Sequence, residues 1–238
     1  HTRLQGDWSS DVCSSESYYQ QALEIKRASL EPDHPDAILG LNNLAALYHS
    51  QGRYGEAEPL FLQALEIRRA SLGTGHPDVA ASLHNLAALY QSQGRYGEAE
   101  PLFLQALEIR QTTLGPNHPD FATGLNNLAA LYQSQGRYRE AEPLFLQALE
   151  IRQASLGADH RDVAASLNNL ASFYDDQGNY GETERLFKEA LKIWREQLGE
   201  HHPTVATGLS NLAALYSTRG RYGDAELLHQ ESLSIRRE

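Results

Sequence analysis

Apolar residues recur along this chain with the spacing of an α-helix, in pairs of runs that glycines separate. Over residues 77–93 they fall at i, i+3, i+4 and i+7, which places them on one face of a helix. Gly94 follows, where a residue in the left-handed region would end that helix. A second run follows over residues 96–114, and Gly115 ends it. The pattern predicts an antiparallel helical hairpin with its apolar residues at Leu83, Leu86, Ala87 and Tyr90, then at Ala99, Leu102, Phe103, Ala106 and Leu107.

The hairpin recurs every 42 residues, and some copies are nearly identical. Asn85–Gln111 and Asn127–Gln153 differ only at Gly97 and Arg139. Since one hairpin cannot bury both of its faces, neighbouring copies have to stack to form a core. We therefore expect an all-α solenoid with a second helix at residues 16–31 and then five full units, at about residues 35–72, 77–114, 119–156, 161–198 and 203–238.

The first fifteen residues match no part of the repeat. Residues 6–15 read GDWSSDVCSS, which looks like an in-frame translation of a sequencing-adapter oligonucleotide, and they include the only cysteine, Cys13. We expect residues 1–15 to be a disordered artefact that joins the array near Glu16, and a genuine N-terminal tail is the alternative. Neither end of the array at residues 16–238 shows a polar capping helix, so we expect a fragment of a longer protein.

Composition and charge exclude several classes of partner. The formal net charge is −11, which is unlike a nucleic-acid binder or a protein attracted to anionic membranes. No apolar run reaches the roughly 18 residues of a membrane span, and the repeats contain no cysteine. Glycine-rich phosphate loops and metalloprotease motifs do not occur, so we expect no enzyme and no cofactor. A cytoplasmic, protein-directed role is the expectation that remains.

The order of small and aromatic residues in each unit resembles a known family. That order in the first unit is Ala45, Tyr48, Gly52, Tyr54, Ala57, Phe61 and Ala64. It resembles the tetratricopeptide repeat, whose usual unit is about 34 residues. The longer period and the sequences LNNLA and LGxxHPD are similar to the variant in kinesin light chain. The resemblance implies a right-handed superhelix whose first helices line a groove for extended peptides.

One face of each predicted first helix is polar but nearly uncharged, and it lies opposite the apolar stripe. It carries an asparagine in every unit, at Asn43, Asn85, Asn127, Asn169 and Asn211, and beside it Asn42, His84, Asn126 and Asn168. An amide can both donate to and accept from a peptide backbone, so we take these positions as candidate peptide contacts. Hydrogen bonds to the neighbouring helix are the structural alternative.

A basic residue lies 17 positions before the first four ladder asparagines, at Lys26, Arg68, Arg110 and Arg152. In the light-chain relatives, an arginine here reaches the groove and meets acidic peptide residues. The resemblance therefore favours a ligand with acidic residues. The alternative is a surface ion pair with a helical neighbour such as Glu66 or with an acid of the following unit, which would contribute little.

The His-Pro histidines and the departures of the fourth unit each have a structural explanation beside a functional one. Consecutive His-Pro histidines belong to different helices, about 8–10 Å apart or more, whereas zinc ligands lie about 2 Å from one ion. We therefore predict helix capping at these histidines and no metal site. The fourth unit departs from the other copies at several positions, including Asp175, Asp176, Lys188, Lys192 and Trp194. These departures are candidates for specific recognition, with Trp194 as an aromatic anchor, or they are ordinary drift.

Together these features predict a non-catalytic scaffold that binds an extended peptide. The alternative is a regulatory or oligomerising segment of a larger signalling enzyme or NTPase. Uncapped ends also predict self-association of the chain.

Overall fold

The computed structural model describes residues 35–237, and over this range it contains helices and no strand. The first helices of the repeats are α2 (Pro35–Ser50), α4 (Pro77–Ser92), α6 (Pro119–Ser134), α8 (Arg161–Asp176) and α10 (Pro203–Thr218). The second helices are α3 (Tyr54–Leu72), α5 (Tyr96–Leu114), α7 (Tyr138–Leu156), α9 (Tyr180–Leu198) and α11 (Tyr222–Ile235). The predicted all-α repeat array is confirmed. The expectations for residues 1–15, for a helix at residues 16–31 and for Lys26 lie outside the described residues.

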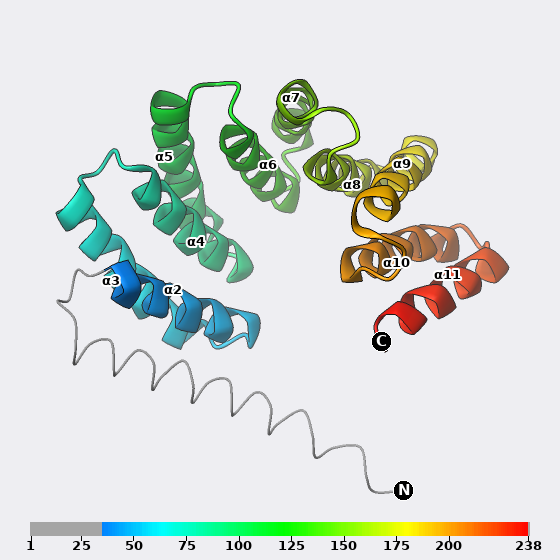
Figure 1. The fold of residues 1–238 in the computed structure, drawn as a ribbon, viewed down its shortest axis with the longest axis horizontal. Helices are drawn as coiled ribbons and strands as arrows, with labels where there is room; N and C mark the ends of the chain where they lie inside the picture. Colours follow the sequence, from blue (N-terminus) through cyan, green and yellow to red (C-terminus); the bar gives the residue numbers. More distant parts are fainter. Residues whose placement is uncertain (1–34, 238) are drawn as a thin grey trace, which may run out of the picture. The chain divides into compact units, whose positions relative to one another are not determined.

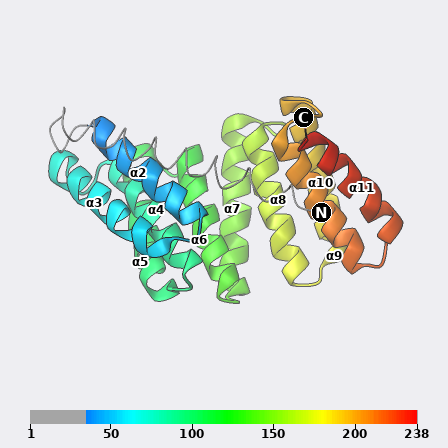
Figure 2. The ribbon, with the colours of Figure 1, turned by 90° about the horizontal axis from the view of Figure 1, so that it is seen from below.

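The described residues form two compact parts, called unit 1 (up to residue 113) and unit 2 (from residue 114), each made of more than one repeat. The described part of unit 1 contains α2 to α5, and unit 2 contains α6 to α11. Consecutive helices within each unit run antiparallel, as the two views show (Figure 1, Figure 2). Each unit is therefore a stack of helical hairpins.

Histidine side chains begin most of the first helices. His76 Nδ1 accepts a hydrogen bond from the backbone N–H of Asp78 at 3.1 Å, and this satisfies one of the donors that a helix start leaves free. Proline follows each capping histidine except His160, where Arg161 takes its place. The same bond occurs at His118, His160 and His202, with lengths of 3.1, 3.2 and 3.1 Å. Helix capping by these histidines is confirmed.

A single glycine makes the turn inside each hairpin. Gly94 has φ +72°, a conformation that residues with a Cβ rarely adopt. It allows the backbone N–H of Arg95 to donate to the carbonyl of Tyr90 at 2.8 Å, the bond that closes a Schellman motif. Gly97 lies inside α5 with an ordinary backbone, which agrees with the arginine at the corresponding position 139.

Small residues lie where the helices of a hairpin approach each other. Ala87 of α4 and Ala99 of α5 have no exposed surface, and Phe103 fills the space beside them with 3 % of its surface exposed. Leu102 and Leu107 are only half-buried, although the helical pattern assigned both to the core. The alanine and phenylalanine positions therefore define the packing, and the two leucines lie at its edge.

Polar side chains join successive repeats through what we call the tyrosine–glutamate bracket. In unit 1, the Tyr90 hydroxyl donates to Glu58 Oε1 at 3.0 Å, and Arg95 Nη1 donates to Glu58 Oε2 at 2.7 Å. The Arg95 guanidinium also lies over the Tyr90 ring, 3.9 Å from its centre.

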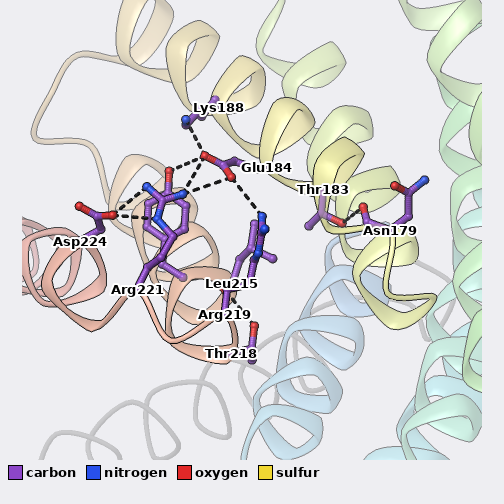
Figure 3. A network of polar contacts seen from close by, with 10 residues as sticks. Asn179, Thr183, Glu184, Lys188, Leu215, Thr218, Arg219, Arg221 and Asp224 are labelled. Carbon is purple, nitrogen blue, oxygen red and sulfur yellow. Dashed lines mark hydrogen bonds and ion pairs between the residues drawn. The ribbon is translucent and has the colours of Figure 1, made fainter.

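The last bracket of unit 2 is the most elaborate (Figure 3). Glu184 accepts from the Tyr216 hydroxyl at 2.9 Å and pairs with Lys188, Arg219 and Arg221. These hydrogen bonds and positive charges, led by the Lys188 ammonium, lower the pKa of Glu184 to about 2. The bracket joins α9 to α10 and to the turn before α11.

Gly94 and Gly97 of unit 1 give a matched test of the hairpin turn. We expect Gly94→Ala to lower the free energy of unfolding by about 1–2 kcal/mol, because alanine is strained at positive φ. Gly97→Ala should leave stability unchanged or raise it by up to about 1 kcal/mol, because no atom lies within 4 Å of the added Cβ. Urea unfolding followed by circular dichroism measures both. Equal effects would show that backbone conformation is not what selects glycine at position 94.

Candidate functional site

The asparagine ladder lies on the surface of the first helices in both units. Asn43 is exposed, and Asn85, Asn127, Asn169 and Asn211 are half-buried. Alanines one helical turn further along, such as Ala88 and Ala130, are also partly exposed. This small, polar surface of the first helices is called the ladder face below. Within each unit it has the chemistry needed to accept a peptide backbone, namely amides among small side chains.

Two of the four candidate residues just before the ladder, Asn42 and Asn126, are buried, whereas His84 and Asn168 are half-buried. Asn42 and Asn126 have 8 % and 5 % of their surface exposed. Asn42 Nδ2 donates to the carbonyl of Ile38 in its own helix at 3.0 Å. These two residues, which the sequence placed on the binding face, therefore offer little surface to a ligand.

The ladder asparagines differ in how their amides are used. In unit 2, Asn211 Nδ2 donates to Asn168 Oδ1 at 2.9 Å, a hydrogen bond between successive first helices. Asn85 follows Asn42 with the same offset along the chain, and Asn169 follows Asn126, but the Oδ1 atoms of Asn42 and Asn126 accept no hydrogen bond. The amides of Asn85 and Asn169 are therefore not engaged in the bond that Asn211 makes.

His84 of α4 occupies the position that is equivalent to Asn42 and Asn126. Its ring centre lies 5.5 Å from that of Phe103 on α5. Burial, helped by the nearby charge of Arg110, lowers the pKa of His84 from 6.5 to about 4. The imidazole is thus held neutral by its apolar surroundings, which suits packing better than ligand binding.

The arginines bridge to the following first helix. Arg152 has 7 % of its surface exposed, and its Nη1 donates to the Asp162 carbonyl at 3.1 Å and to Ser166 Oγ at 2.8 Å. Its Nη2 donates to Thr123 Oγ1 of the ladder face at 2.9 Å. Burial lowers the pKa of Arg152, and the charges of Asp162 and Asp120 counteract part of that effect. This arginine supports the stacking of α6, α7 and α8.

Arg68 repeats the arrangement in unit 1. Its Nη1 donates to the Asp78 carbonyl at 3.1 Å and to Ser82 Oγ at 2.8 Å. Arg68 and Arg110 are half-buried. The expected alternative for Arg68, an ion pair with Glu66, is replaced by bonds to a backbone carbonyl and a serine of the next repeat.

Trp194 takes the place of these arginines in the fourth repeat. It has 5 % of its surface exposed, and its Nε1 donates to the Arg161 carbonyl at 3.2 Å. A Cβ at position 208 would lie 3.0 Å from Trp194 Cζ3, so Gly208 provides the space that the indole needs. In this position Trp194 packs between helices and is too buried to serve as an exposed aromatic anchor.

The serine partners of the arginines were missed at the sequence level. Ser82 and Ser166 each lie 14 residues after an arginine, whereas the equivalent residue is Gly124 after Arg110 and Gly208 after Trp194. Because glycine follows both an arginine and the tryptophan, the repeat pattern alone gives no signal for the contact.

The fourth repeat also makes the ladder face locally acidic. Asp175 and Asp176 lie at the C-terminal end of α8, where Gln133 Nε2 donates to Asp176 Oδ2 at 2.7 Å. Burial, and then the neighbouring charge of Asp176, raise the pKa of Asp175. Within unit 2, the ladder face therefore has Arg152 near the beginning of the first helices and carboxylates near the end of α8.

Two properties of residues 35–237 bear on other functions. Over this range, no group of three or more histidine, cysteine, aspartate or glutamate side chains is arranged to hold a metal ion. None of the helices in the same range has the length and apolar character needed to cross a bilayer.

The helical hairpins and the alanine, tyrosine and phenylalanine positions define an all-helical repeat protein. The sequence profile of the family described as tetratricopeptide repeat matches residues 14–70, 37–112, 78–154, 120–182 and 162–238. These matches extend over most of the chain, and the chain belongs to the tetratricopeptide repeat family.

Solved structures extend the comparison. BtubC (BKLC) from P. vanneervenii is 25 % identical with a TM-score of 0.69, over 98 % of this chain and 92 % of that one. A second solved structure contains the nearly identical TPR-like repeats of a kinesin-light-chain candidate from Podosopora anserina. It is 30 % identical to this chain with a TM-score of 0.64, and the match covers 85 % of this chain and 96 % of that one. A point variant of those repeats is 29 % identical with a TM-score of 0.65, over 86 % and 95 %. No curated protein matches the sequence. The solved relatives confirm the resemblance to kinesin-light-chain-like arrays.

The half-buried His84 gives a test by pH. The pKa of His84 in the folded chain is lower than 6.5, so its contribution to stability is complete above that pH and is lost as the pH falls through about 4. We expect His84→Asn, the residue found at positions 42, 126 and 168, to reduce the loss of stability over this range by up to about 3 kcal/mol. Urea unfolding at pH 7 and pH 4.5 measures the difference.

His49→Gln is the matched control, because it also removes a histidine from unit 1 and introduces the residue found at positions 91 and 133. If both variants changed the pH dependence equally, burial of His84 would not be the cause.

Proposed function

We propose that this chain is a protein-interaction scaffold whose ladder face binds an extended peptide. The repeats of this family generally mediate contacts between proteins, and the ladder face gives this general role a location. The observation that carries the proposal is the state of the asparagine amides. Asn85 and Asn169 lie at the surface and do not donate to the Oδ1 atoms of Asn42 and Asn126.

Peptide backbone and asparagine amide have matching hydrogen-bonding groups, because each offers a donor and an acceptor. The ladder repeats from helix to helix within each unit, at the roughly 8–10 Å spacing of packed helices, so about every third residue of an extended ligand would meet an equivalent amide. A hydrogen bond of this kind contributes about 1 kcal/mol, so a few of them predict weak binding, on the order of micromolar.

The charges beside the ladder face support acidic residues in the ligand, at one end of the helices. Arg68 and Arg152 lie beside the N-terminal halves of the first helices and are held there by Ser82 and Ser166. Asp176 at the end of α8 has the opposite charge. We therefore place the acidic ligand residues over the N-terminal halves, where the guanidinium groups attract them without leaving their partners.

The ladder can be tested with peptides selected by phage display on the intact chain. The best binder is labelled and titrated against the wild type by fluorescence anisotropy. We expect Asn85→Ala combined with Asn169→Ala to weaken binding by about fivefold, because a peptide on the ladder face of either unit loses one hydrogen bond of about 1 kcal/mol. The helical circular dichroism should not change.

Asn211→Ala is the control, because this asparagine already donates to Asn168. It should lower thermal stability and change affinity much less. Unchanged affinity in the double variant would refute the ladder as the binding surface, and selected peptides without a preference for acids would refute the charge assignment.

Self-association is a second candidate, which the outer face of α11 supports. Leu233 is 52 % exposed, whereas the corresponding Leu191 on α9 is 6 % exposed. Leu191 is covered by α10, where a Cβ at position 208 would lie 3.3 Å from Leu191 Cδ1. Tyr222 and Leu227 add exposed apolar surface on the same helix. This is the kind of surface that one repeat presents to the next, and a second copy of the chain could cover it.

Sedimentation velocity over a range of concentrations tests this association. We expect the wild type to form dimers or larger species at high concentration, and Leu233→Glu to shift the equilibrium towards monomer because a charge would have to be buried. Leu104→Glu, a change at an exposed leucine of α5, is the control. Association that both substitutions weaken equally would show that α11 has no special role.

A further inference from the structure

A cleft lies between the second helices α9 and α11, away from the ladder face. Its volume is about 460 Å³, and it is lined by Lys188, Leu191, Lys192, Arg195, Glu196, Glu200, Leu212, Tyr216 and Leu228. Leu191, Leu212 and Tyr216 are buried and form an apolar floor, and Leu228 is half-buried. By helical spacing, Leu212 and Tyr216 face another side of α10 than Asn211 and Ala214 of the ladder face. The cleft is therefore separate from the proposed peptide groove.

Two lysines give this cleft a charge that its equivalents lack. Lys188 corresponds to Leu62, Leu104 and Leu146, and Lys192 corresponds to Glu66, Glu108 and Glu150. Three basic and two acidic side chains line the cleft. The positions that correspond between α7 and α9 carry a single charge, the carboxylate of Glu150. On one side of α9, the fourth repeat thus has a lysine in place of a leucine at position 188 and a lysine in place of a glutamate at position 192.

The fold uses these two lysines to different extents. Lys188 Nζ lies 2.7 Å from Glu184, but that carboxylate also has Tyr216, Arg219 and Arg221 as partners (Figure 3). The Lys192 side chain is 73 % exposed, and its contact with Glu196 is 3.8 Å long. Such an exposed pair contributes little to stability. A role outside the fold is therefore open to Lys192, and Lys188 can contribute to it while it remains beside Glu184.

The acidic side chains of the cleft have partners of their own. Arg195 Nε lies 2.9 Å from Glu200 Oε2, and Arg195 Nη2 also pairs with Glu231 of α11. These pairs join α9 to the following turn and to α11, and Lys192 remains the exposed, weakly paired cation on the lysine side of the cleft. The cleft has an apolar floor, one basic wall and one wall of paired charges.

We propose that this cleft is a second docking site, which takes an acidic segment of a partner protein with one bulky apolar side chain. The apolar side chain packs over Leu191, Leu212 and Leu228. Carboxylates next to it in the partner's sequence pair with the ammonium groups of Lys188 and Lys192. Apolar burial supplies affinity, and the charges select an acidic partner over a basic one.

The probe for this site is a short labelled peptide with a central Leu-Phe pair and glutamates on both sides. It is titrated by fluorescence anisotropy against the intact chain. We expect Lys188→Leu combined with Lys192→Glu, the residues of the other repeats, to weaken binding by about tenfold, and Lys192→Glu alone by a few fold. A peptide with lysines in place of the glutamates should bind far more weakly to the wild type, and so should one with Gly-Gly in place of Leu-Phe.

Arg139→Glu is the matched control, because it makes the same change of charge at an exposed position of unit 2 outside the cleft. It should leave the affinity for the probe unchanged, and so should the double alanine variant at Asn85 and Asn169. Lys192→Glu keeps the test valid if the double lysine variant unfolds. Equal binding to wild type and Lys192→Glu would overturn the proposal. Equal loss in Arg139→Glu, or loss in the asparagine variant, would overturn it too.

Discussion

Each helical hairpin of this chain has apolar residues on more surface than its own two helices can cover, and stacking against a neighbour is the only way to bury the rest. Alanines make that stacking close. Ala87 and Ala99 have no exposed surface, and Phe103 fills the space between helices. Leu191 shows what a neighbour contributes, because α10 reduces its exposure to 6 %, whereas its equivalent Leu233 is 52 % exposed. Every other feature of the chain is arranged around this requirement.

Polar side chains also form contacts at the boundaries between stacked repeats. Arg152 and Ser166 form one solution at the boundary between repeats, and Trp194 with Gly208 forms another in the same position. The tyrosine–glutamate bracket is a third contact, built from Tyr216 and Glu184 in unit 2. Near-identical repeats thus allow a charged contact at one boundary and an apolar contact at the equivalent position of another.

The two proposed binding surfaces consist of side chains that the stacking of the repeats leaves at the surface. First helices meet their neighbours through small residues, which leaves asparagine amides at the surface of the ladder face. Second helices α9 and α11 leave a cleft over α10, and the side chains of its rim are free to change charge without disturbing the core. In this proposal the ladder face binds a peptide backbone through its amides, and the cleft selects an acidic segment through its lysines. One scaffold would then have two kinds of binding site.

The repeats alone determined the helices, the glycine turns, the histidine caps and the family. All of these depend on contacts within a few residues, such as the bond from Asp78 N–H to His76, so the local pattern is sufficient to predict them. The fourth repeat was also visible as a departure, and Lys188 and Lys192 were among its differences. Nothing in the pattern connected these two residues with Leu212 or Leu228, because those leucines belong to other helices.

Tertiary packing decided which of two adjacent residues faces outward. Asn42 and Asn43 are neighbours, about 100° apart around a helix, and the helical period cannot say which of them a neighbouring helix covers. Packing buries Asn42 and leaves Asn43 exposed. The burial of Arg152 and the lowered pKa of His84 were hidden for the same reason, because both depend on helices that contact these residues from elsewhere in the stack. Local spacing determines a helix and its glycine turn, whereas the exposure of a side chain depends on every helix packed around it.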